Sequence, residues 1–436
     1  MLSDSTAAAD RARQARHVVA ASFIGTTFEW YDFFIYASAA ALAFGPLFFP
    51  NVSEFAGTLA SFSTFAVGFL ARPLGGIIIG HYGDRIGRKQ MLVVCLVTMG
   101  VATVLIGLLP TYAQIGIWAP ILLVLLRVMQ GIGVGGEWGG AVLMVVEYAP
   151  PHRRGFYGGF VQIGVPAGLI LANLAFLAAV AWVPEAEFLR WGWRIPFLLS
   201  ALLVIIGLVI RFRLEETPVF LEARAKAPPR ERLPLVETIR SHWRQVVTGG
   251  LVLSSNTMMG YVLIAYVLSY GVSKLGMPRS TMITLVLIAA SVWFATCLLF
   301  AAWSDRWGRR RVCIWGLVGG LLWAFPLFWL LDTREPVLMG LGLAVLAVPV
   351  AASYAPIAAL LSELFPTRIR YTGTSLAYQF GSLVGGAFVP MISVALFELT
   401  GTSLAISAYM AVAIGVGLAA TRFIPETTTV RLDKAD

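Results

Sequence analysis

The sequence alternates long apolar segments with short polar ones. Twelve apolar segments have about the 20 residues that a helix needs to cross the hydrocarbon core of a bilayer. They begin near His17, Glu54, Met91, Ile115, Phe156, Ile195, Gln245, Thr281, Val312, Pro336, Thr372 and Thr402. We therefore predict an all-α polytopic membrane protein with twelve transmembrane helices.

The longest polar stretch lies between the sixth and seventh apolar segments and is rich in charged residues and proline. We interpret residues 214–244 as a cytoplasmic linker. The linker divides the chain into an N-terminal six-helix bundle, residues 1–213, and a C-terminal six-helix bundle, residues 245–436.

The composition agrees with a membrane protein. Of the 436 residues, 58% are hydrophobic and 13% are charged, whereas a soluble domain carries about 25% charged residues. A soluble enzyme could not bury this much apolar surface, so that class is excluded. The net charge of +9 does not indicate nucleic-acid binding, because the basic residues lie in short clusters between apolar segments. Of the 32 Lys and Arg, 25 fall on one set of alternate loops and 5 on the other, which predicts that both termini are cytoplasmic.

We expect no metal and no cofactor. The cysteines, Cys95, Cys297 and Cys313, are dispersed, which gives neither a disulfide framework nor a metal-ligand spacing. The glycine-rich string 131–136 follows a membrane helix and lacks the Lys-Ser/Thr ending of a phosphate loop. We interpret its glycines as places where neighbouring helices approach closely.

Two motifs occur twice in the chain. Gly83-Asp84-Arg85-Ile86-Gly87-Arg88-Lys89 is echoed 221 residues later by Ser304-Asp305-Arg306-Trp307-Gly308-Arg309-Arg310. Glu147-Tyr148-Ala149-Pro150 is echoed 216 residues later by Glu363-Leu364-Phe365-Pro366. Two echoes at nearly one offset indicate two parallel six-helix halves that can rock about a site between them. Chance similarity between basic loops is the alternative, but it does not explain the shared order Asp-Arg-x-Gly-Arg.

Several charged residues fall inside the predicted spans. Glu29 lies about 18 Å into the first helix and Asp32 about one turn further, so both are near mid-membrane and three residues apart. Two adjacent carboxylates cannot both ionise cheaply, so we expect one of them to carry the coupled proton, with Arg127 as the switched partner. The alternative is a static ion-pair cluster that fixes helix packing. Arg72 either belongs to this cluster or reaches toward the inner surface, and Glu137 is interpreted as a gate or packing residue.

The C-terminal half has polar uncharged residues in its spans where the N-terminal half has charges. We infer that the N-terminal half supplies charge and coupling, while hydroxyls, amides and rings of the other half shape a substrate site. The candidate substrate-binding residues are Tyr36, Arg72, Arg127, Asn256, Tyr261, Tyr354, Tyr378 and Gln379. Packing is the alternative role for each tyrosine.

The two Asp-Arg-x-Gly-Arg loops, with Arg127-Val128-Met129-Gln130-Gly131-Ile132-Gly133, resemble signatures of the major facilitator superfamily. Three further motifs resemble those of its metabolite:proton symporter family: Phe28-Glu29-Trp30-Tyr31-Asp32-Phe33, Arg72-Pro73-Leu74-Gly75-Gly76 and Gly135-Gly136-Glu137-Trp138-Gly139-Gly140. The resemblance covers nearly the whole chain. It implies two six-helix bundles and a carrier for organic acids such as shikimate, or for proline and betaine.

The resemblance also implies an inner gate made by the repeated loops. Asp84 would face the start of the eleventh helix near Tyr371-Thr372-Gly373, and Arg85 and Arg88 would meet Glu147. By the repeat, Asp305 would meet the start of the fifth helix near Gly155, and Arg306 and Arg309 would meet Glu363. These contacts would hold the inner gate closed in the outward-open state and would break in the inward-open state. The candidate gating residues are Gly83, Asp84, Arg85, Gly87, Arg88, Glu137, Glu147, Asp305, Arg306, Gly308, Arg309 and Glu363.

The sequence thus predicts a proton-coupled symporter that imports a small carboxylated metabolite across the bacterial inner membrane. A proline or betaine symporter is the alternative within this class, and a polytopic membrane enzyme or sensor is the alternative outside it. We expect a monomer whose partners are the metabolite, protons and the lipid bilayer. We expect neither enzymatic activity nor binding to nucleic acid.

Overall fold

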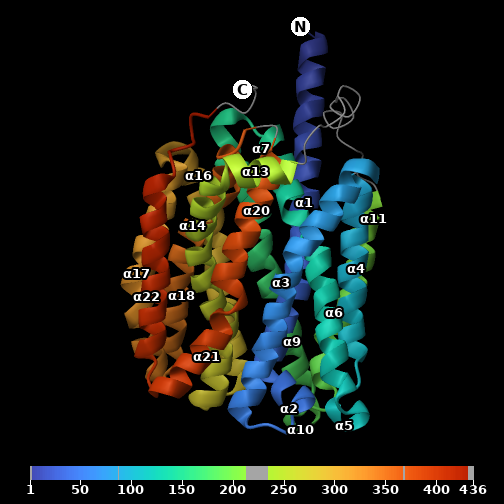
Figure 1. Ribbon diagram of the computed structural model, residues 1–436, viewed down its shortest axis with the longest axis vertical. Helices are drawn as coiled ribbons and strands as arrows, with labels where there is room; N and C mark the ends of the chain where they lie inside the picture. The colour runs from blue at the N-terminus through green and yellow to red at the C-terminus, as the bar shows by residue number, and fades with distance from the viewer. Residues whose placement is uncertain (1, 87, 213–233, 367–368, 431–436) are drawn as a thin grey trace.

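A computed structural model describes residues 2–86, 88–212, 234–366 and 369–430. Over these residues the chain is a bundle of long, nearly parallel helices without a strand (Figure 1). Both termini lie at one end of the bundle, and the short helices α2 (Phe44–Phe48), α5 (Tyr112–Ile115) and α10 (Glu185–Phe188) lie at the other. We call these the terminal end and the far end; the charge bias predicts that the terminal end is cytoplasmic.

The N-terminal half forms the right side of the bundle in Figure 1. Its long elements are α1 (Leu2–Leu42), α3 (Glu54–Ile86), α4 (Arg88–Leu108), α6 (Trp118–Val134), α7 (Glu137–Tyr148), α8 (Arg154–Gln162), α9 (Gly164–Trp182) and α11 (Ile195–Phe212), with the 3-10 turns η1 (Pro151–Arg153) and η2 (Gly192–Arg194).

The C-terminal half begins after a short helix, α13 (Pro234–Ser241), inside the segment predicted as a linker; residues 213–233 of that segment lie outside the described residues. Its elements are α14 (Trp243–Tyr261), η3 (Val262–Tyr266), α15 (Val267–Ser269), η4 (Tyr270–Lys274), α16 (Arg279–Trp307), α17 (Arg309–Asp332), α18 (Pro336–Tyr354), α19 (Ile357–Glu363), α20 (Arg370–Ser382), η5 (Leu383–Ala387), α21 (Val389–Thr400), α22 (Leu404–Ala420) and η6 (Thr421–Phe423).

Ten helical segments of the described chain are long and apolar enough to cross a membrane. They match ten of the twelve predicted spans. The other two predicted spans fall on the helices α1 and α4. In α1 the carboxylates of Glu29 and Asp32 lower the hydropathy of the middle of the helix. In α4 the described side chains form an apolar helix over Val93–Leu108.

Several spans consist of two helices in line, because the backbone deviates at glycine or proline. The fourth span breaks between α6 and α7 at Gly135 and Gly136. A Cβ atom on Gly131 would overlap the carbonyl oxygen of Gly68, and one on Gly135 would overlap that of Arg72. Only glycine therefore lets α6 lie backbone to backbone against α3. This close approach places Arg72 beside the helix that carries Arg127.

Each half packs within itself and meets the other along a few helices. Within the N-terminal half α1 packs on α9, α3 on α6 and α4 on α11; within the C-terminal half α16 and α17 pack on α18, and α14 packs on α20 and α22. Between the halves, α8 and α9 contact α16, α7 contacts α20, α3 contacts η5 and α21, and α1 contacts η3. The site described next lies along this interface.

Candidate functional site

Arg127 lies in the interior of the N-terminal half and is fully buried. Its guanidinium carbon lies 4.3 Å from the ring centre of Phe33, 4.1 Å from that of Tyr36 and 5.0 Å from that of Phe65. Its Nη1 donates to Oε1 of Gln130 at 2.9 Å, whereas Nε and Nη2 have no hydrogen-bond partner.

Arg72 is enclosed in the same way by rings of α1 and α3. Its guanidinium carbon lies 4.3 Å from the ring centre of Phe33, 4.4 Å from that of Phe69 and 5.5 Å from that of Trp30. The residue is only 1% exposed, so it does not reach toward the inner surface, and that alternative is wrong. Nε and Nη2 of Arg72 also lack a hydrogen-bond partner.

No carboxylate in the described parts of the chain lies within ion-pair distance of Arg127 or Arg72. In this state Arg127 is bonded to Gln130 and to neither carboxylate of the first helix, so its role as the switched partner stays a prediction. A buried charge without a counter-ion is destabilising by several kcal/mol. Contact between a desolvated cation and an aromatic face is stabilising by about 2 kcal/mol, which offsets part of that cost. A strained arrangement of this kind is typical of a functional site.

Asp32 is buried in α1, and polar side chains lie between it and Arg127. Ser200 of α11 donates to Oδ1 of Asp32 at 2.5 Å, and Thr103 of α4 lies near the carboxylate. The Thr103 hydroxyl donates to the carbonyl of Met99 at 2.9 Å and accepts from Nε2 of Gln130 at 2.7 Å. Gln130 in turn accepts from Arg127, so these side chains separate the guanidinium from the carboxylate and there is no direct ion pair.

Glu29 and Asp32 have different neighbours, although both are buried in α1. Asp32 contacts α4 and α11, whereas Glu29 lies within electrostatic reach of Tyr378 in the C-terminal half. Because Glu29 and Asp32 are three residues apart on a helix, their side chains point about 60° apart, which is enough to give them different neighbours.

Glu137 is also buried and is the first residue of α7.

Tyr261 of the C-terminal half contacts the phenylalanine rings that surround Arg72 and Arg127. Its ring centre lies 5.3 Å from that of Phe69, 5.6 Å from that of Phe65 and 6.4 Å from that of Phe33. The three phenylalanines were not predicted as site residues. Their helical spacing along α1 and α3 is the only sequence signal that could have indicated them.

Three other candidates lie closer to the terminal end, where the halves touch. The Tyr378 ring stacks on that of Trp138 with centres 3.7 Å apart, and its hydroxyl lies 3.4 Å from that of Tyr354. Nε2 of Gln379 donates to the carbonyl of Gly135 at 2.9 Å. These contacts close the interface on the terminal side of the arginines, between α7 and α20.

Two candidates have their polar groups bonded within their own half. Nδ2 of Asn256 donates to the carbonyl of Val350 and to the Ser353 hydroxyl, both at 2.8 Å, which ties α14 to α18. The Tyr36 hydroxyl donates to that of Thr64 at 2.6 Å, while its ring lies against Arg127.

The predicted contact of Asp305 with the start of the fifth span is present. The carboxylate accepts the backbone N–H groups of Gly155 and Phe156, each at 2.8 Å, from the other half of the molecule. Arg309 donates to Asp305 at 2.6 Å and lies 3.4 Å from Glu363. This cluster joins the two halves at the terminal end.

Other gate predictions differ from the structure or fall outside it. Arg306 is exposed and does not meet Glu363, because it lies in the last turn of α16 whereas Arg309 begins α17. Gly308, between them, has φ +104°, a conformation suited to glycine. Glu147 lies 3.8 Å from Arg370. The side chains of Asp84, Arg85 and Arg88, and the surroundings of Gly83, are not described, and Gly87 lies outside the described residues.

A segment after the last span also joins this cluster, although no sequence pattern predicted it. The Thr427 hydroxyl donates to Glu363 at 2.6 Å, and Glu426 accepts the backbone N–H of Arg309 at 2.7 Å. Arg154, in the N-terminal half, donates to the carbonyl of Val430 at 2.8 Å. The segment therefore contacts both halves.

The far end is hollowed between the halves. A pocket of about 340 Å³ is lined by Glu54 and Thr58 of α3 and by Tyr266, Lys274 and Glu398 of the C-terminal half. The halves therefore meet at the terminal end, whereas at the far end a pocket lies between them although α3 still contacts α21.

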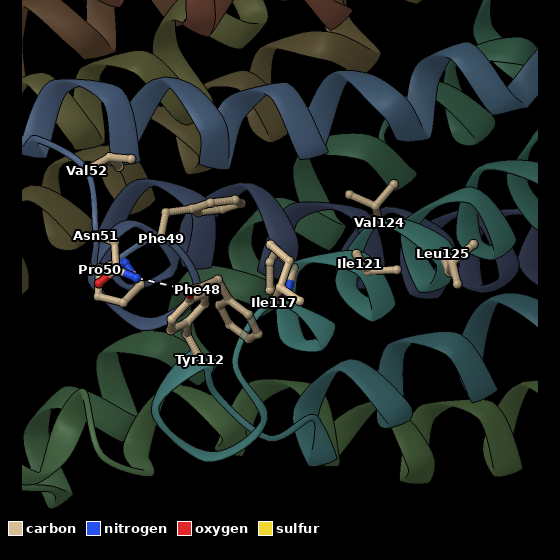
Figure 2. A pocket seen from close by; sticks show the side chains of 11 residues that line it. Phe48, Phe49, Pro50, Asn51, Val52, Tyr112, Ile117, Ile121, Val124 and Leu125 are labelled. Carbon is tan, nitrogen blue, oxygen red and sulfur yellow. Dashed lines mark hydrogen bonds between the residues drawn. The ribbon is translucent and has the colours of Figure 1, made fainter.

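A second far-end pocket, of about 490 Å³, is apolar and lies away from the arginines (Figure 2). Asn51 donates to the Tyr112 hydroxyl at 3.0 Å at its rim, but exposed Ile117 and Leu125 face outward. Its apolar lining does not suit a polar substrate.

Two helical halves, a membrane-length span pattern and buried charges in the N-terminal half, whose surrounding rings contact the other half, define the class of the protein as a polytopic membrane carrier. The family model of the Major Facilitator Superfamily matches residues 19–390. The chain belongs to this superfamily.

Three relatives from Escherichia coli (strain K12) are similar over most of their length. The inner membrane metabolite transport protein YhjE is 41% identical over 421 residues, 94% of each chain. The shikimate transporter is 41% identical over 387 residues, 88% of each chain. The proline/betaine transporter is 35% identical over 412 residues, 92% of this chain and 82% of the relative. The relatives are transporters, as predicted, and not enzymes.

A solved structure has the same fold. The proton:xylose symporter XylE, bound to 6-bromo-6-deoxy-D-glucose, superposes with a TM-score of 0.77 at 19% sequence identity, covering 96% of this chain and 97% of the other. The predicted fold class is confirmed: an all-helical, multi-pass membrane protein of the major facilitator type.

Proposed function

We propose that this transporter is a proton-coupled symporter that imports a small carboxylated metabolite across a bacterial inner membrane. The observation that carries the proposal is the pair of buried arginines, Arg72 and Arg127, each with two guanidinium nitrogens free of hydrogen bonds. The similarity to an inner membrane metabolite transport protein and to a shikimate transporter supports the compartment and the substrate class.

A carboxylate fits the arginine pair for chemical reasons. Guanidinium groups bind carboxylates through two parallel N–H donors, and both arginines have such donors unused. The rings of Phe33, Phe69 and Tyr261 would cover the apolar faces of a small solute. Tyr261 belongs to the other half, so a solute held here would contact both halves.

The coupled proton is assigned to Asp32. We infer that, with no anion bound, the positive charge of Arg127 stabilises the charged form of Asp32 across the intervening side chains of Gln130 and Thr103. A substrate carboxylate would neutralise Arg127, and Asp32 would then be more stable with a proton. Proton and anion binding therefore favour each other, which is the thermodynamic requirement of symport. Glu29, near Tyr378 at the half interface, is the second candidate.

A zwitterion such as proline or betaine is the alternative substrate, favoured by the relative that carries proline and betaine. A zwitterion also presents a carboxylate to Arg127 and Arg72. Its cationic end would need a carboxylate or an aromatic face, and Glu29, within electrostatic reach of Tyr378, is one acidic candidate.

Uptake by proteoliposomes with an inward proton gradient tests both parts of the proposal. We expect organic acids, shikimate among them, to compete for uptake, and betaine to be ineffective. Blockage by excess betaine and by no organic acid would contradict the assignment of an anionic substrate.

The Asp32→Asn variant tests the coupling site. We expect it to lose proton-driven accumulation while counterflow exchange survives, because only the protonation step is removed. Asp332→Asn is the matched control: Asp332 likewise accepts from hydroxyl groups, those of Tyr270 at 2.6 Å and Ser403 at 2.5 Å, but lies at the far end. Equal accumulation by wild type and Asp32→Asn would contradict the assignment.

A further inference from the structure

A basic pocket lies at the terminal end, on the outside of the C-terminal half and away from the arginine pair. It has a volume of about 530 Å³ and is formed where α16 turns into α17. Arg306, Arg310 and Arg311 line it together with Trp307 and Glu426. The turn at Gly308 brings the end of one helix and the start of the next around this space.

The charge of the pocket is not balanced by its surroundings. No ion pair in the described residues involves the three lining arginines. Among the described lining residues Glu426 is the only carboxylate, and it already accepts the backbone N–H of Arg309 at the start of α17. The nearby carboxylates Asp305 and Glu363 are engaged by Arg309. The pocket therefore has an excess of positive charge and unused guanidinium donors.

The side chains of α17 place this pocket at the level of lipid headgroups. One face of α17 is exposed along its length: Arg311, Trp315, Val318, Leu322, Phe325 and Trp329. In Figure 1 the helix lies at the outer edge of the bundle. The 18 residue-to-residue steps from Arg311 to Trp329 span about 27 Å, close to the thickness of the hydrocarbon core, about 30 Å. Arg311 therefore ends a lipid-facing stripe.

Tryptophans mark the same level. The Trp307 and Trp315 rings are 5.0 Å apart, and both side chains are nearly half exposed. Tryptophan is enriched where hydrocarbon meets headgroups. A pocket of arginines beside these rings thus opens toward headgroups of one leaflet.

We propose that this pocket binds the phosphate group of an anionic phospholipid in the leaflet at the terminal end. Arginine forks bind phosphate oxygens through paired N–H donors, and the acyl chains would continue along the exposed face of α17. The proposal does not depend on the substrate or on the coupling site. It adds a lipid site next to Arg309, the residue that holds the gate carboxylates.

Native mass spectrometry of the purified full chain in detergent tests the site with phosphatidylglycerol and phosphatidylcholine. The test variant is R306Q/R310Q/R311Q. The matched control, R240Q/R244Q/R422Q, removes the same charge from exposed arginines outside the pocket. We expect the affinity for the first phosphatidylglycerol to fall about tenfold or more in the test variant, since each arginine contributes to the attraction. It should change little in the control, and phosphatidylcholine binding should not change in either.

Equal losses in both variants would mean non-specific attraction and would overturn the proposal, as would no loss in the test variant. If inorganic phosphate binds wild type as tightly as the lipid does, and loses its site in the same variant, the pocket binds a soluble anion and the lipid assignment is wrong. Arg311→Gln compared with Arg422→Gln gives the same decision if the triple variant does not fold.

Discussion

The contact of Asp305 with the fifth span gives a quantitative prediction about the gate. Its carboxylate accepts two backbone N–H groups, from Gly155 and Phe156, across the two halves. Asp305→Asn keeps the shape but removes the charge and turns an N–H₂ group toward one of these donors. A hydrogen bond to a charged group contributes about 1.5–3 kcal/mol. We therefore expect the closed terminal end to lose about 2 kcal/mol relative to the open one.

That loss corresponds to a fall of about 30-fold in the ratio of closed to open molecules. The ion pair of Asp305 with Arg309 does not change this value much, because both residues belong to the C-terminal half and remain together in both states.

Electron–electron resonance distances between spin labels can measure the ratio. His152→Cys in the N-terminal half and Phe423→Cys in the C-terminal half place labels at exposed positions of the terminal end. The three native cysteines are buried and react little. We expect Asp305→Asn to move the population from the short to the long distance. Asp332→Asn, whose partners lie in its own half, should not. An unchanged distribution in Asp305→Asn would refute the gate assignment.

Two further predictions concern Arg127 and the close packing of α6 on α3. Arg127→Gln should weaken binding of an anionic substrate at least tenfold, since a close charge pair contributes about 2–5 kcal/mol. Tracer binding measures this, and unchanged affinity would contradict the assignment. Gly131→Ala should lower the free energy of unfolding by about 1–3 kcal/mol, because its Cβ would overlap the Gly68 carbonyl. Gly415→Ala, whose Cβ would meet nothing within 4 Å, should be neutral in the same thermal unfolding assay.

Features that depend on one helix or one loop could be predicted from the sequence. Membrane-length hydropathy located ten of the spans that the structure contains. The repeated Asp-Arg-x-Gly-Arg motif, with the family resemblance, predicted the contact of Asp305 with Gly155 that joins the two halves. The hydropathy signal is local, because it needs only a period along the chain, whereas the partner of Asp305 was implied by the family resemblance together with the repeat.

Features that depend on the register between helices could not be predicted. The partners of Asp32, Ser200 and Thr103, come from two other helices, and nothing in the first helix specifies them. Helical spacing groups Glu29 with Asp32, but their different neighbours follow from how α1 is rotated against α4, α11 and the C-terminal half. The contacts of Thr427 were missed for the same reason.

Proton movement during substrate uptake is the measurement that tests the central claim most directly. Wild-type proteoliposomes in weakly buffered medium, with no imposed gradient, receive an organic acid while the external pH is recorded. The account predicts that the medium becomes alkaline as the substrate enters, and that Asp32→Asn vesicles exchange substrate without this change. Substrate entry into wild-type vesicles with no proton movement would contradict the account.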